Sequence, residues 1–126
     1  RFSIIHLPDI KMSKKIDPNK VKIEESKLFF QKIKKSDTVI LLDEKGESFS
    51  SKMFSKEIEN YMIKGKKKII FMIGGIYGFS NEIYLKFPKQ IAFSQMTFSH
   101  QMIRLFFCEQ LYRAFTIINN HPYHNS

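Results

Sequence analysis

The sequence has little cysteine and no long hydrophobic run, and each absence excludes a class of protein. Cys108 is the single cysteine, so neither a disulfide framework nor a cysteine-based metal cluster is available within the chain. No stretch approaches the roughly 18 apolar residues that a membrane-spanning helix needs. We therefore expect a soluble protein of the reducing cytoplasm.

Arginine is also scarce, although the chain is strongly basic. Arg1, Arg104 and Arg113 are its only arginines, and lysine supplies most of a net charge of +9. A basic balance of this kind favours polyanionic partners such as RNA, because lysines displace the counterions of phosphates. The three arginines are therefore candidates for a specific role, since their planar, forked guanidinium suits carboxylates and phosphates.

The hydrophobic residues, 43% of 126 with thirteen phenylalanines, indicate one packed domain. Apolar runs predict strands at 2–7, 38–42, 69–73 and 90–93, and helical spacing predicts helices over about 17–35, 51–64, 81–87 and 100–119. Strands that alternate with helices predict an α/β fold, a mostly parallel sheet flanked by helices.

Particular residues are expected to set the ends of these elements. Pro8 and Asp9 should close the first strand, and residues 43–46 the second. Ser50 or Ser51 can cap the helix that follows, which should end at Gly65. That helix should carry Phe54, Ile58 and Met62 toward the core.

Three segments leave predicted strands, and ligands of open parallel sheets bind at the carboxyl ends of strands. The segments are 42–46, 73–78 and 93–98. The glycines of the second, Gly74, Gly75 and Gly78, match neither a dinucleotide fingerprint nor a P-loop, which disfavours a nucleotide-dependent enzyme. Spacing alone favours a tight turn that needs glycine over a ligand-binding loop.

The last predicted helix is apolar over more than half of its circumference, which suggests that a second copy of the chain covers part of it in a homodimer. His100 and Arg104 project into this apolar arc. A buried Arg104 would need an anion, either an internal carboxylate or a group of the substrate or active site, and both remain open.

A polar strip is expected on the opposite side of that helix, formed by Glu109, Tyr112, Arg113 and Thr116. The spacing of Glu109 and Arg113 favours a surface salt bridge. In the tail, His121 and His124 are too few for a strong metal site, and the tail is expected to dock rather than fray.

Several runs, in order and spacing, closely resemble the RlmH-type ribosomal RNA methyltransferases of the SPOUT class. They are Ile73-Gly74-Gly75, Ser94-Gln95-Met96-Thr97-Phe98-Ser99-His100-Gln101, Glu109-Gln110-Leu111-Tyr112-Arg113-Ala114 and Pro122-Tyr123-His124, with Leu41-Leu42-Asp43 and Gly46 before them. The resemblance extends over about 2–124. It implies a homodimeric α/β domain with a deep C-terminal trefoil knot, and a further strand and helix ahead of residues 2–7. We expect a single domain over 1–126 that lacks this beginning.

The resemblance also implies an activity, methyl transfer from S-adenosylmethionine to N3 of a pseudouridine of 23S ribosomal RNA within the assembled ribosome. The implied cofactor contacts are Leu42, Gly74, Phe93, Ser94, Gln95, Met96, Thr97 and Phe98. The implied candidates for base, phosphate contact or ring positioning are His100, Arg104, Glu109, Tyr112, Arg113, Tyr123 and His124. Ser99 stands where the family usually has proline, and Asn125-Ser126 where it often has a basic residue or histidine. No metal is implied, and the alternative is a noncatalytic RNA-binding or ribosome-associated module.

Overall fold

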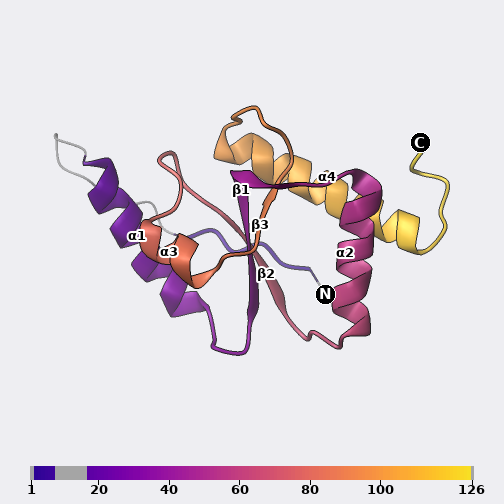
Figure 1. Cartoon of the computed structure of the whole chain (residues 1–126), viewed down its shortest axis with the longest axis horizontal. Coiled ribbons are helices and arrows are strands. Elements are labelled where there is room, and N and C mark those ends of the chain that lie inside the picture. Colours follow the sequence, from indigo (N-terminus) through magenta and orange to yellow (C-terminus); the bar gives the residue numbers. More distant parts are fainter. Residues whose placement is uncertain (1, 8–16, 126) are drawn as a thin grey trace.

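The structure is a computed structural model that describes residues 2–7 and 17–125, and its strands alternate with helices as the sequence predicts (Figure 1). The elements in chain order are α1 (Pro18–Lys32), β1 (Thr38–Ser48), α2 (Ser51–Ile63), β2 (Ile69–Ile73), α3 (Asn81–Lys86), β3 (Gln90–Ala92) and α4 (His100–Ile118). The predicted α/β class is therefore confirmed.

The sheet has three parallel strands in the order β2-β1-β3. β1 lies in the middle, and its residues Ile40 and Leu41 are fully buried. A strand covered on both faces is read in the sequence as an unbroken apolar run, because neither face meets water. This explains why 38–42 could be recognised as a buried strand.

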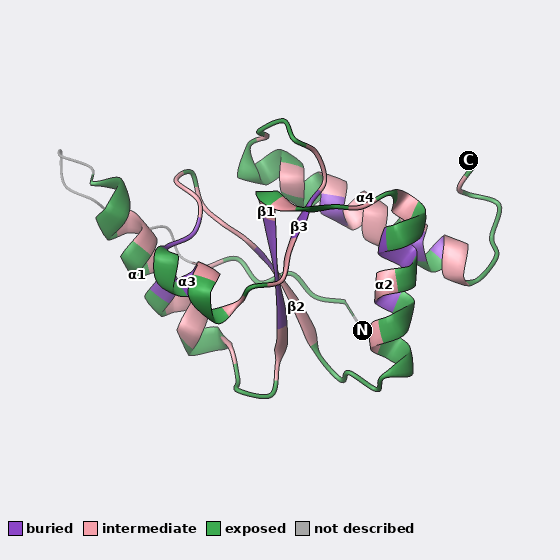
Figure 2. Ribbon diagram, viewed as in Figure 1, coloured by how far each residue is buried: buried purple, intermediate pink, exposed green. Residues whose placement is uncertain are grey.

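Helices cover both faces of the sheet, as Figure 1 shows, with α1 and α3 on one face and α2 and α4 on the other. The α1 side is packed around Val39, Leu41, Met72, Phe79 and Ile83. The α4 side is packed around Ile40, Leu42, Phe54, Ile58, Ile91, Phe107 and Ala114. In Figure 2 the buried residues follow β1 and the inward sides of the helices. Residues that alternate along β1 thus serve two separate cores.

Each helix begins after a residue whose side chain accepts a backbone hydrogen bond: Asp17, Ser50, Ser80 and Ser99. Such caps satisfy amide groups that have no partner within the first helical turn. Ser50, rather than Ser51, is the cap of α2. Gly65 follows that helix at a φ of 69°, a conformation that favours glycine, as the predicted stop requires.

The predicted first strand is wrong, because residues 2–7 form no strand in the structure. Phe2 and Ile5 are more than half exposed, and the three-stranded sheet does not include this segment. An apolar run becomes a strand only where a neighbouring strand pairs with its backbone groups. Pro8 and Asp9, its predicted end, lie outside the described residues.

The predicted end of the second strand is also wrong, since β1 continues to Ser48. Leu42 and Glu47 both pair with Ile91, so the intervening residues 43–46 bulge out of register. An added Cβ at Gly46 would lie 2.6 Å from the carbonyl carbon of Gln90. The bare glycine backbone therefore lets β3 approach the bulged part of β1 closely.

Met62 was predicted to face the core, but its side chain is 53% exposed. Phe54 and Ile58 do face the core, and Tyr61 packs against the same cluster at half-burial. The inward face of α2 turns from residue 58 to residue 61, one helical turn on, so Met62 lies beside it. None of the helices in the described ranges has the length and apolar content needed to cross a bilayer.

Candidate active site

Leu42 of the central strand lies between Ile73 of β2 and Ile91 of β3, with which it is paired in register. The three strands run in the same direction, so the bulge after Leu42 and the segments that leave β2 and β3 share one end of the sheet. The three segments in which the sequence predicts ligand binding therefore leave neighbouring strands at the same edge of the sheet. That Leu42 contacts a cofactor stays a prediction.

The turn after β2 is closed by a hydrogen bond of 3.0 Å from the amide of Gly78 to the carbonyl of Gly75. Gly78 has a φ of 81°, and an added Cβ at Gly74 would lie 3.2 Å from the carbonyl carbon of Gly78. The prediction of a tight turn that needs glycine is confirmed. The carboxylate of Glu25, from α1, lies against the other side of the turn, beside Gly75.

Two carboxylates in the bulge of β1 connect it to its neighbours. The hydroxyl of Tyr84, in α3, donates a hydrogen bond to Asp43, and the hydroxyl of Thr97 donates one to Glu44. Burial, followed by the bond to Asp43, raises the pKa of the Tyr84 phenol, so that it remains a donor. Thr97 thereby attaches the segment after β3 to the bulge.

Tyr84 and Glu25 are not predicted as parts of the site, and Asp43 is included only as a member of the segment 42–46 and not as a named contact. The acidic pair at 43 and 44 follows a buried strand directly, and this position was the available signal. Tyr84 and Glu25 belong to helices whose distance from the turn could not be deduced from spacing. Their proximity is a product of packing on the α1 side of the sheet.

The segment after β3 is partly anchored and partly exposed. The Ser94 hydroxyl accepts a hydrogen bond of 2.9 Å from the amide of Met96, and the ring of Phe98 packs edge-on against Phe106 of α4 at 5.1 Å. Met96 is 70% exposed, and Gln95 and Thr97 are exposed as well. The backbone here is shaped by local contacts while side chains at its tip remain accessible.

A groove of about 610 Å³ runs from this segment along α4 to the start of α2. It is lined by Phe49, Ser50, Ser51, Phe54, Phe93, Ser94, Phe98, Leu105, Phe106, Glu109 and Gln110. Three of these residues are predicted cofactor contacts, and Glu109 is a predicted catalytic candidate. The groove therefore brings members of the two predicted sets to one surface.

The second part of the candidate site is a polar cluster between α4 and the tail. Glu109 Oε1 accepts hydrogen bonds from Arg113 Nη2 at 2.6 Å and Nε at 3.0 Å, and from the Tyr123 hydroxyl at 3.1 Å. The Tyr123 ring stands edge-on to Tyr112, 4.9 Å away, and beneath the Arg113 guanidinium at 4.8 Å. The predicted pair of Glu109 and Arg113 is confirmed, as the centre of a larger network.

These contacts, with a hydrogen bond of 2.8 Å from the His121 amide to the Thr116 carbonyl, confirm the docked tail. Hydrogen bonds from Arg113 first, then from Tyr123 and Gln110, lower the pKa of Glu109. The bond to Glu109 raises the pKa of Tyr123 in return. The cluster thus keeps a carboxylate charged and a phenol protonated over a wide pH range.

His124 closes this cluster through Nδ1, which lies 3.0 Å from Arg113 Nη1. A guanidinium has only donors, so Nδ1 must act as the acceptor. Gln110 extends the network toward α2, since it donates to Glu109 at 2.9 Å and accepts from Ser51 at 2.7 Å.

His100 and Arg104 are exposed in the single chain, so the alternative of an internal carboxylate that buries Arg104 finds no support among the described residues. Their burial at a boundary with a second copy stays a prediction. The core side of α4 is centred on Phe107 and Ala114, with Ile103, Leu111 and Ile118 packed against the same cluster. Leu105, at 61% exposure, and Phe115 lie outside it. Thr116 was assigned to the polar strip but is 7% exposed, and its hydroxyl donates to the Arg113 carbonyl. Apolar width alone did not show which part of the arc meets the core.

Within residues 2–7 and 17–125, no three His, Cys, Asp or Glu side chains come together in a way that could hold a metal ion. His124 instead bonds to Arg113, and His121 is exposed beside a hollow of about 510 Å³ between α4 and the tail.

Comparison with known proteins gives a consistent result. Residues 1–124 match the family model described as "Predicted SPOUT methyltransferase". The chain is 51% identical to the ribosomal RNA large subunit methyltransferase H of Christiangramia forsetii, over 99% of this chain and 80% of that protein. Proteins of the same name from Flavobacterium johnsoniae and Parabacteroides distasonis are 49% and 45% identical, over 99% and 98% of this chain and 80% and 79% of theirs.

Proposed function

Since the chain belongs to the SPOUT methyltransferase family, we propose that it uses S-adenosylmethionine to methylate N3 of a pseudouridine in 23S ribosomal RNA, within the assembled ribosome of the cytoplasm. The relatives' name supports a substrate in large-subunit RNA. The observation that carries the proposal is the position of Leu42 between Ile73 and Ile91, which brings three strand ends together.

The residues at these strand ends fit a methyl donor with a cationic sulfur. When bound, S-adenosylmethionine supplies an electrophilic methyl group on a sulfonium. Gly74 has no side chain that would keep a ligand from its backbone, and Phe93 and Phe98, which line the groove, offer apolar surface for the adenine. Leu42 is almost wholly buried and would contribute mainly through its backbone. The contact set is completed by Ser94, Gln95, Met96 and Thr97.

The carboxylates of the bulge add charge complementarity to this site. Asp43 and Glu44 stand next to Leu42 and are fixed by Tyr84 and Thr97. A positively charged ligand is favoured near fixed carboxylates, and the attraction is stronger where water is excluded.

Methyl transfer to a ring nitrogen also requires the removal of its proton. Within the polar cluster, Glu109 accepts several hydrogen bonds and has a lowered pKa, and Tyr123 has a raised one. Both are therefore poor proton acceptors near neutral pH. His100 is left as the candidate base, because Nδ1 of His124 already accepts a hydrogen bond from Arg113. Arg104 and Arg113 supply charge for phosphate contact, and Tyr112 and Tyr123 supply surface for ring positioning.

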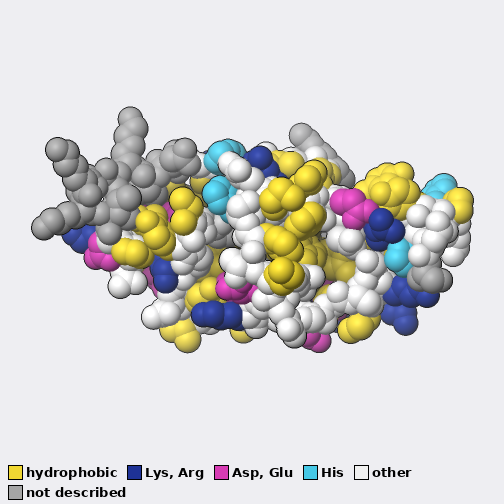
Figure 3. Space-filling view, turned by 90° about the horizontal axis from the view of Figure 1, so that it is seen from above, with side chains coloured by type: hydrophobic (Ala, Val, Ile, Leu, Met, Phe, Trp, Pro, Cys, Tyr) yellow, Lys and Arg dark blue, Asp and Glu magenta, His cyan; other side chains and the backbone are white. Residues whose placement is uncertain are grey.

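We further infer a homodimer with a knotted C-terminal half. The outward side of α4 supports the dimer, because Met102, Leu105, Tyr112 and Phe115 are 39–61% exposed there. Seen from above in Figure 3, hydrophobic side chains gather in the middle of the face. A second copy would remove such a surface from water. It would also cover Arg104, whose guanidinium would then need an anionic group of the partner or the substrate.

The test uses ribosomes that lack the modification, the protein and S-adenosylmethionine with a labelled methyl group. Mass-spectrometric mapping of nucleosides should locate the label on N3 of one pseudouridine, and Gly74→Trp should abolish both cofactor binding and transfer. Absence of cofactor binding by calorimetry would contradict the proposal. Retained RNA affinity without methyl transfer would instead support a noncatalytic RNA-binding module. Sedimentation of a single 15.0 kDa species would contradict the dimer.

A further inference from the structure

Six lysines form a separate surface at the opposite end of the sheet from Leu42. Lys34 and Lys35 belong to the turn before β1, and Lys64, Lys66, Lys67 and Lys68 belong to the turn before β2. All six are exposed. We call this surface the lysine edge.

The two turns that carry the lysine edge lie side by side. The amide of Thr38 donates a hydrogen bond of 3.3 Å to the carbonyl of Lys68, and Thr38 is paired with Ile69 in the sheet. Lys68 Nζ also lies 3.8 Å from Asp37 Oδ2. Residues far apart in the sequence therefore belong to one continuous patch.

Asp37 is the single acidic residue in the turns 33–37 and 64–68, and its carboxylate is already used in a hydrogen bond within the turn. Its side chain is 4% exposed, and Oδ2 accepts a hydrogen bond of 2.8 Å from the amide of Lys34. The remaining lysine charges repel one another across exposed turns, and a polyanion that spans the patch would relieve that repulsion.

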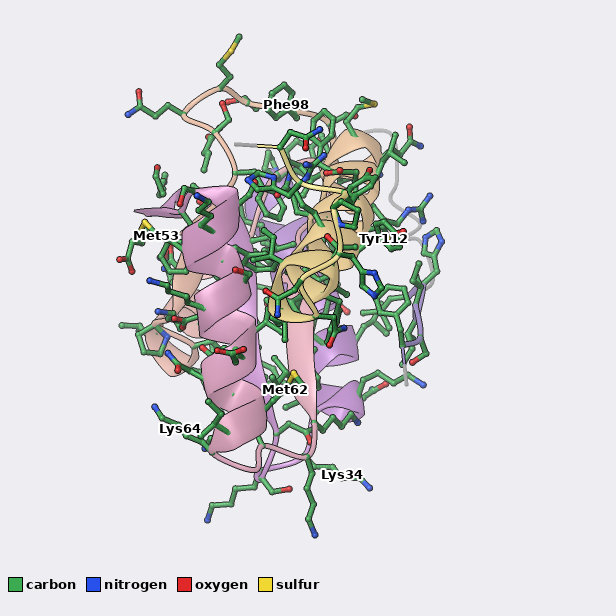
Figure 4. All side chains as sticks on the ribbon, turned by 90° about the vertical axis from the view of Figure 1, so that its right-hand side faces the viewer. Lys34, Met53, Met62, Lys64, Phe98 and Tyr112 are labelled. Carbon is green, nitrogen blue, oxygen red and sulfur yellow. The ribbon has the colours of Figure 1, made fainter. Side chains whose placement is uncertain are left out.

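The position of the lysine edge separates it from the proposed reaction. Thr38 and Leu42 lie at opposite ends of the part of β1 that pairs with β2, about 13 Å apart at the usual rise of a strand. Figure 4 shows Lys34 and Lys64 at one end of the molecule and Phe98 at the other. A phosphate at the lysine edge therefore does not belong to the nucleotide that would be methylated.

We propose that the lysine edge is a second RNA-binding surface, which contacts the phosphate backbone of a double-helical segment away from the target nucleotide. This inference rests on the proposed function, since it takes the partner to be ribosomal RNA. Lysine ammonium groups are point charges that contact phosphates without reading bases, and in A-form RNA the phosphates line grooves that are recognised mainly by shape. The contact should thus be independent of sequence.

The exposed side chains of Met62 and Ile63 border the lysine edge, so an anionic lipid surface is the competing partner to test. The edge variant replaces Lys64, Lys66 and Lys67 by glutamine and leaves Lys68 with Asp37. The control variant replaces three other exposed lysines by glutamine and so changes the net charge by the same amount. They are Lys20 and Lys27 of α1 and Lys56 of α2. Thermal melting and calorimetry with S-adenosylmethionine check that both variants keep the fold and the donor site.

Affinity is measured against salt for two RNA partners, a duplex of about 20 base pairs and ribosomes that lack the modification. Removal of one lysine–phosphate pair should lower the slope of log K against log salt by about 0.9, so the slope should fall by up to roughly 2.7 in the edge variant. At low salt its duplex affinity should fall about tenfold or more. Its KM for ribosomes should rise while kcat at saturation stays unchanged, and the control variant should behave like the wild type.

Equal salt slopes for the edge variant and the control would overturn the inference. So would wild-type protein that binds vesicles of anionic lipid through these lysines and does not bind the duplex. A wild-type protein without cofactor binding would contradict the proposed function, whereas the duplex measurements would still decide on the lysine edge. The two failures are therefore distinguishable.

Discussion

Tyr123, in the tail, donates a hydrogen bond of 3.1 Å to Glu109, fourteen residues earlier on α4. This contact, reinforced by Arg113, folds the tail back onto the helix that also lines the groove. Side chains from the end of the chain are thereby held beside the proposed RNA-facing surface. The Glu109 carboxylate thus holds the tail together with the bonds from Arg113 to His124 and from the His121 amide to Thr116.

Replacement of Glu109 by glutamine should loosen the tail. A charge-assisted hydrogen bond is about twice as strong as a neutral one, but this side chain is 37% exposed, so we expect a loss of about 1 kcal/mol, or roughly fivefold in tail docking. Methyl transfer should fall by a similar factor while affinity for S-adenosylmethionine stays unchanged. Glu59→Gln, at an exposed position of α2, is the control. A wild-type rate in E109Q would show that the tail is held without this charge.

The docked tail should also respond to acid. The pKa of Glu109 is lower in the folded chain than its usual value of 4.5, so its stabilising contribution is fully present above about pH 4.5 and is lost as the pH falls toward the folded pKa. The NMR signals of the Tyr123 ring, which are sensitive to the neighbouring Tyr112 ring, should stay constant from about pH 7 to 5 and move below that range. A transition near pH 6 to 7 would point to a histidine instead of Glu109.

Removal of the Thr97 hydroxyl should weaken donor binding. Thr97 fastens the segment after β3 to Glu44, and valine keeps the shape of the side chain without the hydrogen bond. Because the contact is exposed, we expect a cost of about 1 kcal/mol, seen by calorimetry as a roughly fivefold loss of affinity for S-adenosylmethionine. T97S retains the hydroxyl and should bind like the wild type. Equal losses in T97S and T97V would mean that the hydrogen bond is not responsible.

Alanine at Gly46 should destabilise the sheet. The added Cβ would lie 2.6 to 2.8 Å from backbone atoms of Gln90 and Ile91, which cannot move without displacing β3. We expect a loss of about 2 kcal/mol or more in the free energy of unfolding, measured by denaturant titration. Gly65→Ala is the comparison, because its Cβ meets no atom within 4 Å and only the positive φ is strained. If G65A lost more stability than G46A, close approach of β3 would not be the reason.

The sequence predicted most elements because several local signals agreed. At β1 and β2 an unbroken apolar run indicated a buried parallel strand, and at α2 a serine cap marked the first turn. Residues 2–7 carried the apolar run without a pairing strand, and such pairing is a property of the whole sheet. The bulge at 43–46 was also hidden, because polar residues with a glycine are typical of a turn as well.

The site was only partly predictable for a similar reason. The three strand ends followed from topology, and the pair of Glu109 and Arg113 followed from helical spacing. Tyr84 and Glu25 reach the site from helices on the α1 side, through packing that no spacing rule describes. The environment of Arg104 could not be predicted in the single chain, because an apolar arc does not reveal which of its parts meets the core and which stays exposed.

The stiffness of α4 sets a fixed span between the two ends of the proposed site. His100 opens this helix and Glu109 lies about nine residues further on, so the helical rise separates them by about 13.5 Å along the axis. One residue inserted between them would turn Glu109 by about 100° around the helix and carry the attached tail with it. Insertions and deletions between residues 100 and 109 should therefore not be tolerated, because they would change the distance and angle between His100 and Glu109. Substitutions at the solvent-exposed positions of this stretch would change neither.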